Sequence, residues 1–592
     1  MKNLFLPVSI DDMRRRGWDE IDVVIVTGDA YVDHPSCGAA MIGRYLESKG
    51  YRTGIIAQPD WKNKNDFMRL GRPRLFFGIT SGGVDSMIAN YTAKKIPRRT
   101  DDYSPASGSR GRPDRALIVY SNKAREAYKN VAVVIGGMEA SLRRLAHYDY
   151  WADSVRRSVL ADSKADILVY GMGEAQIAEI ARRMDAGESP LSMDGISGTV
   201  VMRKEMPCSG RCIELPSYEK VSRDKNSFNA AFRLFYGNLD PASAAALAQR
   251  HGDRYALQFP PPEPPETKFL DELYGLPFAR RPHPSYDKAG GVKGFETVRY
   301  SIISHRGCPG ECSFCSLYAH QGRIVRRRSR KSILKEAALL RDQPYFRGTI
   351  TDIGGPTANL YGASCAVWEK GGVCSGKKCL GRKKCPNLKL GYGEFLSLLR
   401  DVRSMEGVKH AFIGSGFRCD LFEGEGGRKL LKELCRHHIS GRMKVAPEHV
   451  VDGVLKVMNK PGPDSYESFR EAFDRVNPPE AKKVFLVNYF ISGHPGSTLR
   501  DALEMALYFM KHRMHPEQVQ DFIPLPMTLS AAMYHTGKDP FTGRDVYVPK
   551  SYREREMQRA LIQYRNPGSR APVIEALRQL GEERLIKRFF PK

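Results

Sequence analysis

The sequence predicts an α/β protein in which an N-terminal doubly wound domain precedes a partial, open (βα)6 barrel and a short C-terminal extension. Short apolar runs alternate with helical periodicity in the first 195 residues, which is typical of a parallel sheet covered by helices. The same alternation resumes near residue 296, after the proline-rich stretch 259–265. At 592 residues the chain is also too long for a single hydrophobic core.

The N-terminal domain is expected over residues 1–195. Buried strands are predicted at 22–27, 53–57, 131–135 and 166–170. Helices are predicted at 39–48 and 174–184. Ligands of such sheets bind in the crevice at the carboxyl ends of the strands. The loops 28–38, 136–141 and 171–174 would form that crevice.

Residues 196–295 are predicted as a connecting region that contains a helix at 242–249 and the proline-rich linker. Cys208 and Cys212 form a C-x3-C pair within it, which is a weak metal signal by itself. The barrel is expected over 296–530, and a basic helical extension over 531–592.

Composition and charge exclude several classes of protein. No apolar run is long enough to span a bilayer, and no secretory signal is evident. Twelve Cys at ligand-like spacings in such a chain favour metals in a reducing compartment, so we expect a cytoplasmic protein without a membrane partner. A net charge of +26 attracts polyanions, and RNA stays open as a partner, with basic runs at 323–331 and 377–384.

The strongest motif is the cysteine loop, Gly307-Cys308-Pro-Gly-Glu-Cys312-Ser-Phe-Cys315, between a predicted strand and a predicted helix. Iron–sulfur clusters are normally held by Cys thiolates. Three thiolates would leave one iron of a [4Fe–4S] cluster open to another ligand. Zinc is the alternative, with His305 or His320 as the fourth ligand.

Four further strand ends follow the cysteine loop, and each carries small or polar residues. They contain Gly354 and Gly355, then Ser415 and Arg418, then Glu448 and His449, and lastly the turn 493–498. In βα barrels the active site lies at the carboxyl ends of the strands, so these segments should share one edge.

An insert lies between the strand end that carries Gly354 and Gly355 and the next helix, and it contains four cysteines: Cys365, Cys374, Cys379 and Cys385. Its low apolar content indicates a loop folded by metal. Zinc would make it a structural staple, and a second iron–sulfur cluster would make it an electron relay or a substrate anchor. The spacing leaves both open.

The cysteine loop, with Phe314 directly before Cys315, resembles the signature of radical S-adenosylmethionine (SAM) enzymes. That resemblance implies a [4Fe–4S] cluster on Cys308, Cys312 and Cys315 whose open iron is chelated by SAM. Gly354 and Gly355 resemble the family's Gly-Gly-Glu segment, although Pro356 stands in place of the Glu. The residues expected to help hold SAM are Phe314, Gly354, Gly355, Ser415 and Arg418.

The order of segments over nearly the whole chain resembles the YgiQ family of radical SAM proteins, including its cobalamin-binding-like N-terminal domain. Cobalamin binders that ligate cobalt use D-x-H-x-x-G, whereas Asp33 and His34 are adjacent here and Gly38 follows one residue too late. This departure argues against cobalt ligation by His34, and we do not expect cobalamin to bind.

The resemblance implies an enzyme that cleaves SAM reductively to a 5′-deoxyadenosyl radical, with a flavodoxin or ferredoxin as reductant. Neither the substrate nor a catalytic acid, base or radical quencher follows from the sequence. Two alternatives stay open: cobalamin-dependent methyl transfer, and a non-catalytic, zinc-stapled protein that binds RNA.

Overall fold

The computed structural model describes residues 4–109, 111–206, 211–477 and 484–591. The chain forms two compact units. The N-terminal unit comprises residues 1–301, 319–322 and 371–373, and the C-terminal unit comprises 302–318, 323–370 and 374–592. No helix of the described residues has the length and apolar character needed to cross a membrane.

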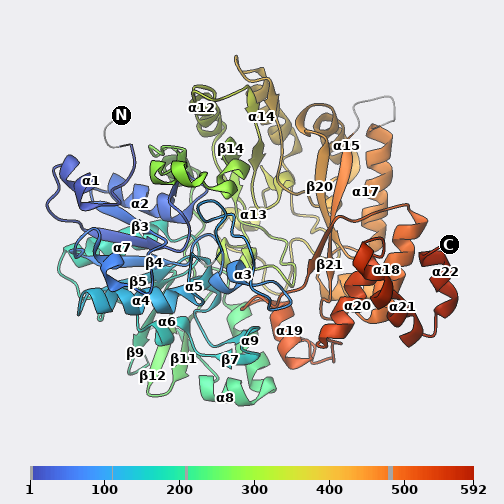
Figure 1. Cartoon of the computed structure of the whole chain (residues 1–592), viewed down its shortest axis with the longest axis horizontal. Helices are drawn as coiled ribbons and strands as arrows, with labels where there is room; N and C mark the ends of the chain where they lie inside the picture. Colours follow the sequence, from blue (N-terminus) through green and yellow to red (C-terminus); the bar gives the residue numbers. More distant parts are fainter. Residues whose placement is uncertain (1–3, 110, 207–210, 478–483, 592) are drawn as a thin grey trace. The chain divides into compact units, whose positions relative to one another are not determined.

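The N-terminal unit is built on one large sheet with the strand order β10-β11-β12-β9-β8-β5-β4-β1-β3 (Figure 1). Five neighbouring strands are parallel. These are β3 (Thr53–Ala57), β1 (Val23–Thr27), β4 (Phe76–Thr80), β5 (Val133–Gly136) and β8 (Ile167–Val169). Their side chains are almost all buried, as expected for strands covered on both faces. The predicted mixed α/β fold is confirmed.

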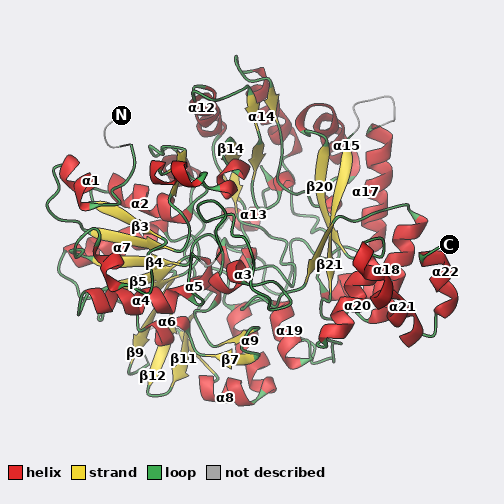
Figure 2. Ribbon diagram, viewed as in Figure 1, coloured by secondary structure: helices red, strands yellow, loops and turns green. Residues whose placement is uncertain are grey.

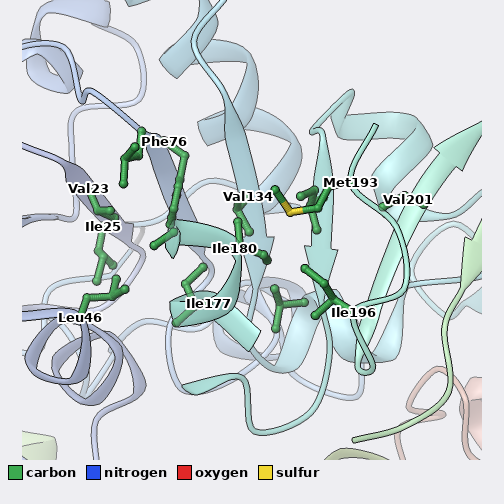
Figure 3. Packing of buried hydrophobic residues seen from close by; sticks show 14 of the residues in the cluster. Val23, Ile25, Leu46, Phe76, Val134, Ile177, Ile180, Met193, Ile196 and Val201 are labelled. Carbon is green, nitrogen blue, oxygen red and sulfur yellow. The ribbon is translucent and has the colours of Figure 1, made fainter. Parts of the chain in front are cut away.

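Helices cover this sheet from both sides. The helices α2 (Gly38–Ser48) and α7 (Glu174–Asp185) share a core with the sheet, in which Leu46, Ile177 and Ile180 lie against strand residues (Figure 3). The helix α4 (Ala116–Ala127) packs against β4, β5 and the short helix α6 (Val159–Ser163). Apolar periods of two in the strands and 3.6 in the helices produce this arrangement.

The region expected as a connector instead supplies four strands to the same sheet. They are β9 (Thr199–Arg203), β10 (Cys212–Leu215), β11 (Ala246–His251) and β12 (Arg254–Gln258). The predicted helix at 242–249 is therefore wrong, because pairing of β11 with β10 and β12 overrides the helix propensity of an alanine-rich segment. Cys208 lies outside the described residues.

In the C-terminal unit strands alternate with helices along the chain (Figure 2). β14 (Ser301–Ile303) neighbours β18 (Asp352–Gly354), and β17 (Thr349–Ile350) is parallel to β19 (His410–Ala411). A parallel bridge from Phe417 to Val445 leads to β20 (Arg442–Glu448), which is followed by β21 (Phe485–Ser492) and β22 (Gln518–Asp521). The intervening helices are α12 (Arg330–Arg341), α14 (Tyr392–Ser404), α15 (Gly424–Glu433), α17 (Pro463–Val476) and α18 (Leu499–Lys511).

The end of the chain packs onto the last barrel helix. α20 (Tyr552–Ile562) and α21 (Arg570–Gln579) form an apolar cluster with α18 that includes Leu503, Leu561 and Leu577. The basic helical extension expected from the sequence is thus held to the barrel by a hydrophobic core of its own.

In the N-terminal sheet the strand order reverses between β1 and β4, which is where ligands of doubly wound sheets bind. Here the chain itself occupies that switch point. The side chain of Arg112, fully buried, donates to the Ser81 carbonyl (3.1 Å) and to Asp101 (2.7 Å), and it lies 2.8 Å from Asp29. Gly28 is so close to the next loop that a Cβ there would lie 2.3 Å from the Ser81 carbonyl oxygen.

We predict that Gly28→Ala destabilises the N-terminal unit by about 1–3 kcal/mol, because the added methyl group has to separate two packed loops. The matched control is Gly38→Ala at the start of α2, where a Cβ meets nothing within 4 Å. Calorimetric thermal unfolding should show a lowered transition for Gly28→Ala alone. Equal effects of the two substitutions would contradict the closed switch point.

Candidate functional site

The cysteine loop is the connection of a tight antiparallel pair, β15 (His305–Arg306) and β16 (Arg326–Arg327). Gly307 opens the loop with φ of +87°, and a Cβ there would lie 2.0 Å from the Ile324 carbonyl oxygen. Only glycine tolerates both conditions. The backbone conformation at Gly307 therefore fixes the direction in which the loop leaves β15, and with it the position where the three cysteines begin.

Cys308, Cys312 and Cys315 share one confined space. A Cβ on Gly310 would lie 3.3 Å from Cys308 Sγ and 3.7 Å from Cys312 Sγ. The Cys315 backbone N–H donates to the Cys312 carbonyl at 3.0 Å. Burial raises the pKa of the Cys308 and Cys315 thiols in the metal-free chain, and the neighbouring Cys312 raises both pKa values further. These thiols therefore need a positive partner to ionise together.

Arg418 supplies positive charge at this loop. Its buried guanidinium donates from Nη1 to Cys312 Sγ (3.5 Å) and from Nε and Nη2 to Asp420 (3.1 and 2.9 Å). The Asn359 side chain fixes the backbone of Arg418 through two hydrogen bonds. Burial lowers the pKa of Arg418, but the charges of Asp420 and Cys312 outweigh it, so the pKa lies above its usual value. The sequence-based role of Arg418 in SAM binding stays a prediction.

The segment after α16 (Asp452–Val457) clamps the loop from another side. Asn459 Nδ2 donates to the carbonyls of Glu311 (2.8 Å) and Gly310 (3.4 Å). The Ser313 backbone N–H donates to the Met458 carbonyl at 3.0 Å. Backbone groups within the loop that would otherwise be buried without partners are thereby satisfied.

A buried histidine fixes the aromatic residue of the motif. His494 Nδ1 bonds to the Pro495 carbonyl (2.7 Å), and its Nε2 bonds to Ser530 Oγ (2.7 Å), which in turn lies 2.8 Å from Ser313 Oγ. The ring of Phe314 stands edge-on to His494 with centroids 6.0 Å apart. Burial lowers the pKa of His494 to about 3, so the ring is neutral, and its hydrogen bonds hold it in place beside Phe314.

The two glycines at the end of β18 lie in tight contact with residues from other strand ends. A Cβ on Gly354 would lie 2.1 Å from Ser415 Oγ, and a Cβ on Gly355 would lie 2.5 Å from the His305 ring. Asp352 accepts hydrogen bonds from the Ser415 hydroxyl and backbone and from the Gly414 backbone. The structure thus brings Gly354, Gly355 and Ser415 together, as the shared strand edge requires.

Glu448 ends β20 with φ of +70°, a strained value for a residue other than glycine. Burial raises the pKa of its carboxyl group, against the opposing charges of Lys460 and Arg418. His449 is also buried, and its Nδ1 accepts the Val451 backbone N–H at 3.1 Å. Strain and burial at a strand end mark Glu448 as a candidate polar contact for a bound ligand.

The donor set of the loop fits an iron–sulfur cluster. In such a cluster each thiolate binds a different iron, so the sulfurs surround a volume and do not meet at one atom. Within the described ranges, no three His, Cys, Asp or Glu side chains converge as ligands of one metal ion. Both nitrogens of His305 are engaged, Nδ1 with Ser304 Oγ (2.8 Å) and Nε2 with the Thr357 carbonyl (3.1 Å).

The four-Cys insert also gathers thiols. The Cys385 backbone N–H donates to the Cys379 carbonyl at 2.9 Å, and Cys365 directly precedes the short helix α13 (Ala366–Glu369). The pKa of the Cys379 thiol is raised to about 11, mainly because the thiol is partly buried. The neighbouring Trp368 acts to lower this pKa, and the charges of Cys365 and Cys385 act to raise it. Cys365 and Cys385 therefore both lie within electrostatic reach of Cys379, and the metal that the insert holds stays a matter of prediction.

In the N-terminal unit, His34 does not fit a cobalt ligand. Its Nδ1 accepts the Ser36 backbone N–H at 3.1 Å, so the neutral ring carries its proton on Nε2. That buried Nε2 has no hydrogen-bond partner among the described residues, and the ring stands edge-on to Phe295. A ring nitrogen has to be unprotonated to bind a metal, so neither nitrogen is available without rearrangement.

Asp352 and Asn459 were missed by the sequence interpretation. Asp352 could have been noticed as a charged residue in an apolar strand two positions before Gly354. Asn459 gives no comparable signal, because it follows a short helix far from the cysteine loop in sequence and contacts it only through tertiary structure.

Comparisons with known proteins identify relatives of this chain. A family model described as "Radical SAM N-terminal" matches residues 5–301, and a domain of unknown function (DUF3362) matches residues 517–588. A UPF0313 protein from Clostridium botulinum (strain ATCC 19397 / Type A) is 48% identical over 587 residues, which cover 99% of this chain and 91% of that protein.

A UPF0313 protein from Methanocella arvoryzae is 49% identical over 97% of this chain and 96% of its own length. Among solved structures, the radical SAM methyltransferase TsrM from Kitasatospora setae, with cobalamin and a [4Fe–4S] cluster bound, has a TM-score of 0.50 at 13% identity. That match covers 94% of this chain and 89% of TsrM, and it supports the same fold. The chain therefore belongs to the YgiQ family of radical SAM proteins, together with its UPF0313 relatives.

Proposed function

We propose that this protein is a radical SAM enzyme whose [4Fe–4S] cluster is held by Cys308, Cys312 and Cys315. The observation that carries the proposal is the gathering of three half-buried cysteines on one loop, with Arg418 hydrogen-bonded to Cys312. Three such thiolates would hold three irons of the cluster and would leave the fourth open to another ligand. When bound, the cluster would supply one electron to SAM, whose cleavage gives methionine and a 5′-deoxyadenosyl radical.

The chain's own residues then have separable tasks. Arg418 offsets negative charge at the thiolates, and Asp420 holds the guanidinium in place. Because Gly354 and Gly355 have no side chains, Ser415 and His305 pack directly against the end of β18 and hold the strand ends close together. Asp352 holds Ser415 next to them. Phe314, supported by His494, supplies an aromatic edge beside Cys315.

For the four-Cys insert we propose a second metal, either a second iron–sulfur cluster or zinc. The Coulombic effects of Cys365 and Cys385 on Cys379 support a shared metal, and Gly381 of the insert packs against Asn459, which also hydrogen-bonds to the cysteine loop. A redox-active metal there could relay electrons, whereas zinc would be structural.

The first test is anaerobic purification followed by dithionite and SAM. We expect bound iron and sulfide, and 5′-deoxyadenosine that disappears in the combined Cys308→Ala, Cys312→Ala and Cys315→Ala variant, because those thiols hold the cluster. Cys435→Ala, at a buried cysteine outside both groups, should keep the product and serves as the control. Zinc at both cysteine groups without 5′-deoxyadenosine would instead favour the non-catalytic RNA-binding alternative.

A second prediction concerns the glycine edge. Gly354→Ala should weaken SAM binding at least about tenfold, because its Cβ would displace Ser415 and narrow the strand end. Gly416→Ala is the matched control, since a Cβ there meets nothing within 4 Å. Equilibrium binding of SAM to the iron-loaded proteins, with their iron content measured in parallel, separates loss of SAM from loss of the cluster. An unchanged affinity of Gly354→Ala for SAM would show that Gly354 is not part of the SAM site.

Cobalamin-dependent methyl transfer is the second candidate, because the TsrM structure that shares this fold holds cobalamin. The residues of this chain do not fit that cofactor. Arg112, Asp29 and Asp101 fill the switch point of the sheet, and the proton on His34 Nε2 opposes cobalt ligation. We therefore propose that the N-terminal unit acts without a corrinoid.

This proposal predicts that purified protein incubated with hydroxocobalamin and passed through gel filtration keeps far less than one equivalent of corrinoid, as judged by its visible absorption. The spectrum should match that of protein never exposed to the compound. Stoichiometric retention of corrinoid would contradict the closed crevice and restore the methyl-transfer candidate.

A further inference from the structure

The two basic runs of the sequence differ in what their charges contact. In the first run, each of five arginines is held by another part of the C-terminal unit. The pairs are Arg323 with Glu311, Arg326 with the Trp368 carbonyl, Arg327 with Glu394, Arg328 with Glu336, and Arg330 with Asp401. These arginines are committed to the fold, so this run offers little free charge to a partner.

The second run, in the four-Cys insert, presents its charge to solvent. Lys377, Lys378 and Lys383 are exposed and Lys384 is half-buried. Within the part of the chain that the structure describes, none of these four lysines makes an ion pair, whereas Arg382 between them pairs with Asp452. Between residues 369 and 389 the one acidic residue is Glu369. Free, like-signed charge of this density attracts an acidic surface.

This lysine surface is connected to the cysteine loop by direct packing. A Cβ on Gly381 would lie 2.8 Å from Asn459 Oδ1, and the same Asn459 side chain donates to the carbonyls of Gly310 and Glu311. Arg382 also donates to the Lys460 carbonyl at 3.3 Å. One asparagine thus separates the backbone of the insert from the backbone that carries Cys308 and Cys312.

A protein bound to these lysines would therefore lie close to the backbone that carries the three cysteines.

We propose that Lys377, Lys378, Lys383 and Lys384 form the docking surface for an acidic, one-electron carrier protein that reduces the cluster. The proposal rests on the proposed function. In the step it describes, one electron passes from the reduced carrier to the cluster held by Cys308, Cys312 and Cys315. The carrier is oxidised by one electron, and no bond forms or breaks. Charge complementarity speeds such encounters and selects the partner.

RNA is the other polyanion that the charge could attract, but the insert lacks the groups that bind bases. Single-stranded nucleic acids are held by aromatic side chains on which bases stack, in addition to basic residues. Trp368 is the one aromatic residue between 365 and 389, and it is buried in the structure. The surface is thus positive without being a stacking platform, which favours an acidic protein.

The test uses the anaerobically purified, iron-loaded protein and an acidic flavodoxin as the probe. The variant Lys377→Glu with Lys383→Glu reverses two exposed, unpaired charges and leaves Lys378 beside Glu311 intact. Its affinity for oxidised flavodoxin, measured by calorimetry at low salt, should fall at least about tenfold, and the loss should shrink as salt rises. Cluster reduction by flavodoxin hydroquinone, followed by electron paramagnetic resonance, should slow in parallel.

The matched control is Lys432→Glu with Lys511→Glu, which makes the same change in net charge on exposed lysines of α15's end and α18's end. It should bind flavodoxin like the wild type. Reduction by dithionite, which needs no docking surface, should be equal in all three proteins. Flavodoxin binding is measured independently of SAM cleavage. If dithionite and SAM gave no 5′-deoxyadenosine, the proposed enzyme activity would fail, and the docking surface would still be tested by the binding measurement.

Equal flavodoxin affinity in the Lys377/Lys383 variant and the wild type would overturn the proposal, as would an equal loss in the two double variants. It would also be overturned if the variant lost affinity for total transfer RNA while its affinity for flavodoxin stayed unchanged. A specific, salt-sensitive loss of flavodoxin binding in the Lys377/Lys383 variant supports it.

Discussion

Cys308, Cys312 and Cys315 are confined to one loop, and the negative charge that their thiolates would share is the constraint around which the polar structure of the loop is arranged. Burial opposes ionisation of Cys308 and Cys315, and the neighbouring Cys312 opposes it further. Arg418 meets this cost at Cys312, and Asp420 and Asn359 hold Arg418 where it is needed. Much of the polar structure around the loop, including the Asn459 clamp, follows from keeping that arrangement fixed.

The two units treat the carboxyl ends of their strands in opposite ways. In the C-terminal unit the strand ends carry glycines and polar residues, and Gly354 packs tightly against Ser415. In the N-terminal unit the same kind of edge is filled by Arg112 and its two carboxylate partners. The proposed function requires a ligand at the first edge, whereas the second edge is closed by internal ion pairs whose loss would leave buried charge unpaired.

The sequence predicted the α/β fold, because strands such as 53–57 and helices such as 174–184 have strong local periodicity. It failed where tertiary pairing overrides local preference: residues 242–249 read as a helix, but β11 is drawn into the sheet by its neighbours. The cysteines and glycines of the site could be named from spacing alone. Asn459 and the buried network of His494 could not, because their contacts join segments far apart in sequence. The difference between free and committed basic runs likewise requires knowing the partners of each side chain.

The central claim is that three cysteines hold a four-iron cluster with one iron open to SAM. Mössbauer spectroscopy of protein loaded with iron-57, with and without SAM, tests it most directly. A variant lacking the four cysteines of the insert would keep the signal to the cluster of Cys308, Cys312 and Cys315. The account predicts that SAM raises the isomer shift of one iron in four, because that iron gains ligands, and leaves the other three unchanged. A spectrum that SAM does not alter, or a site that contains no iron, would contradict it.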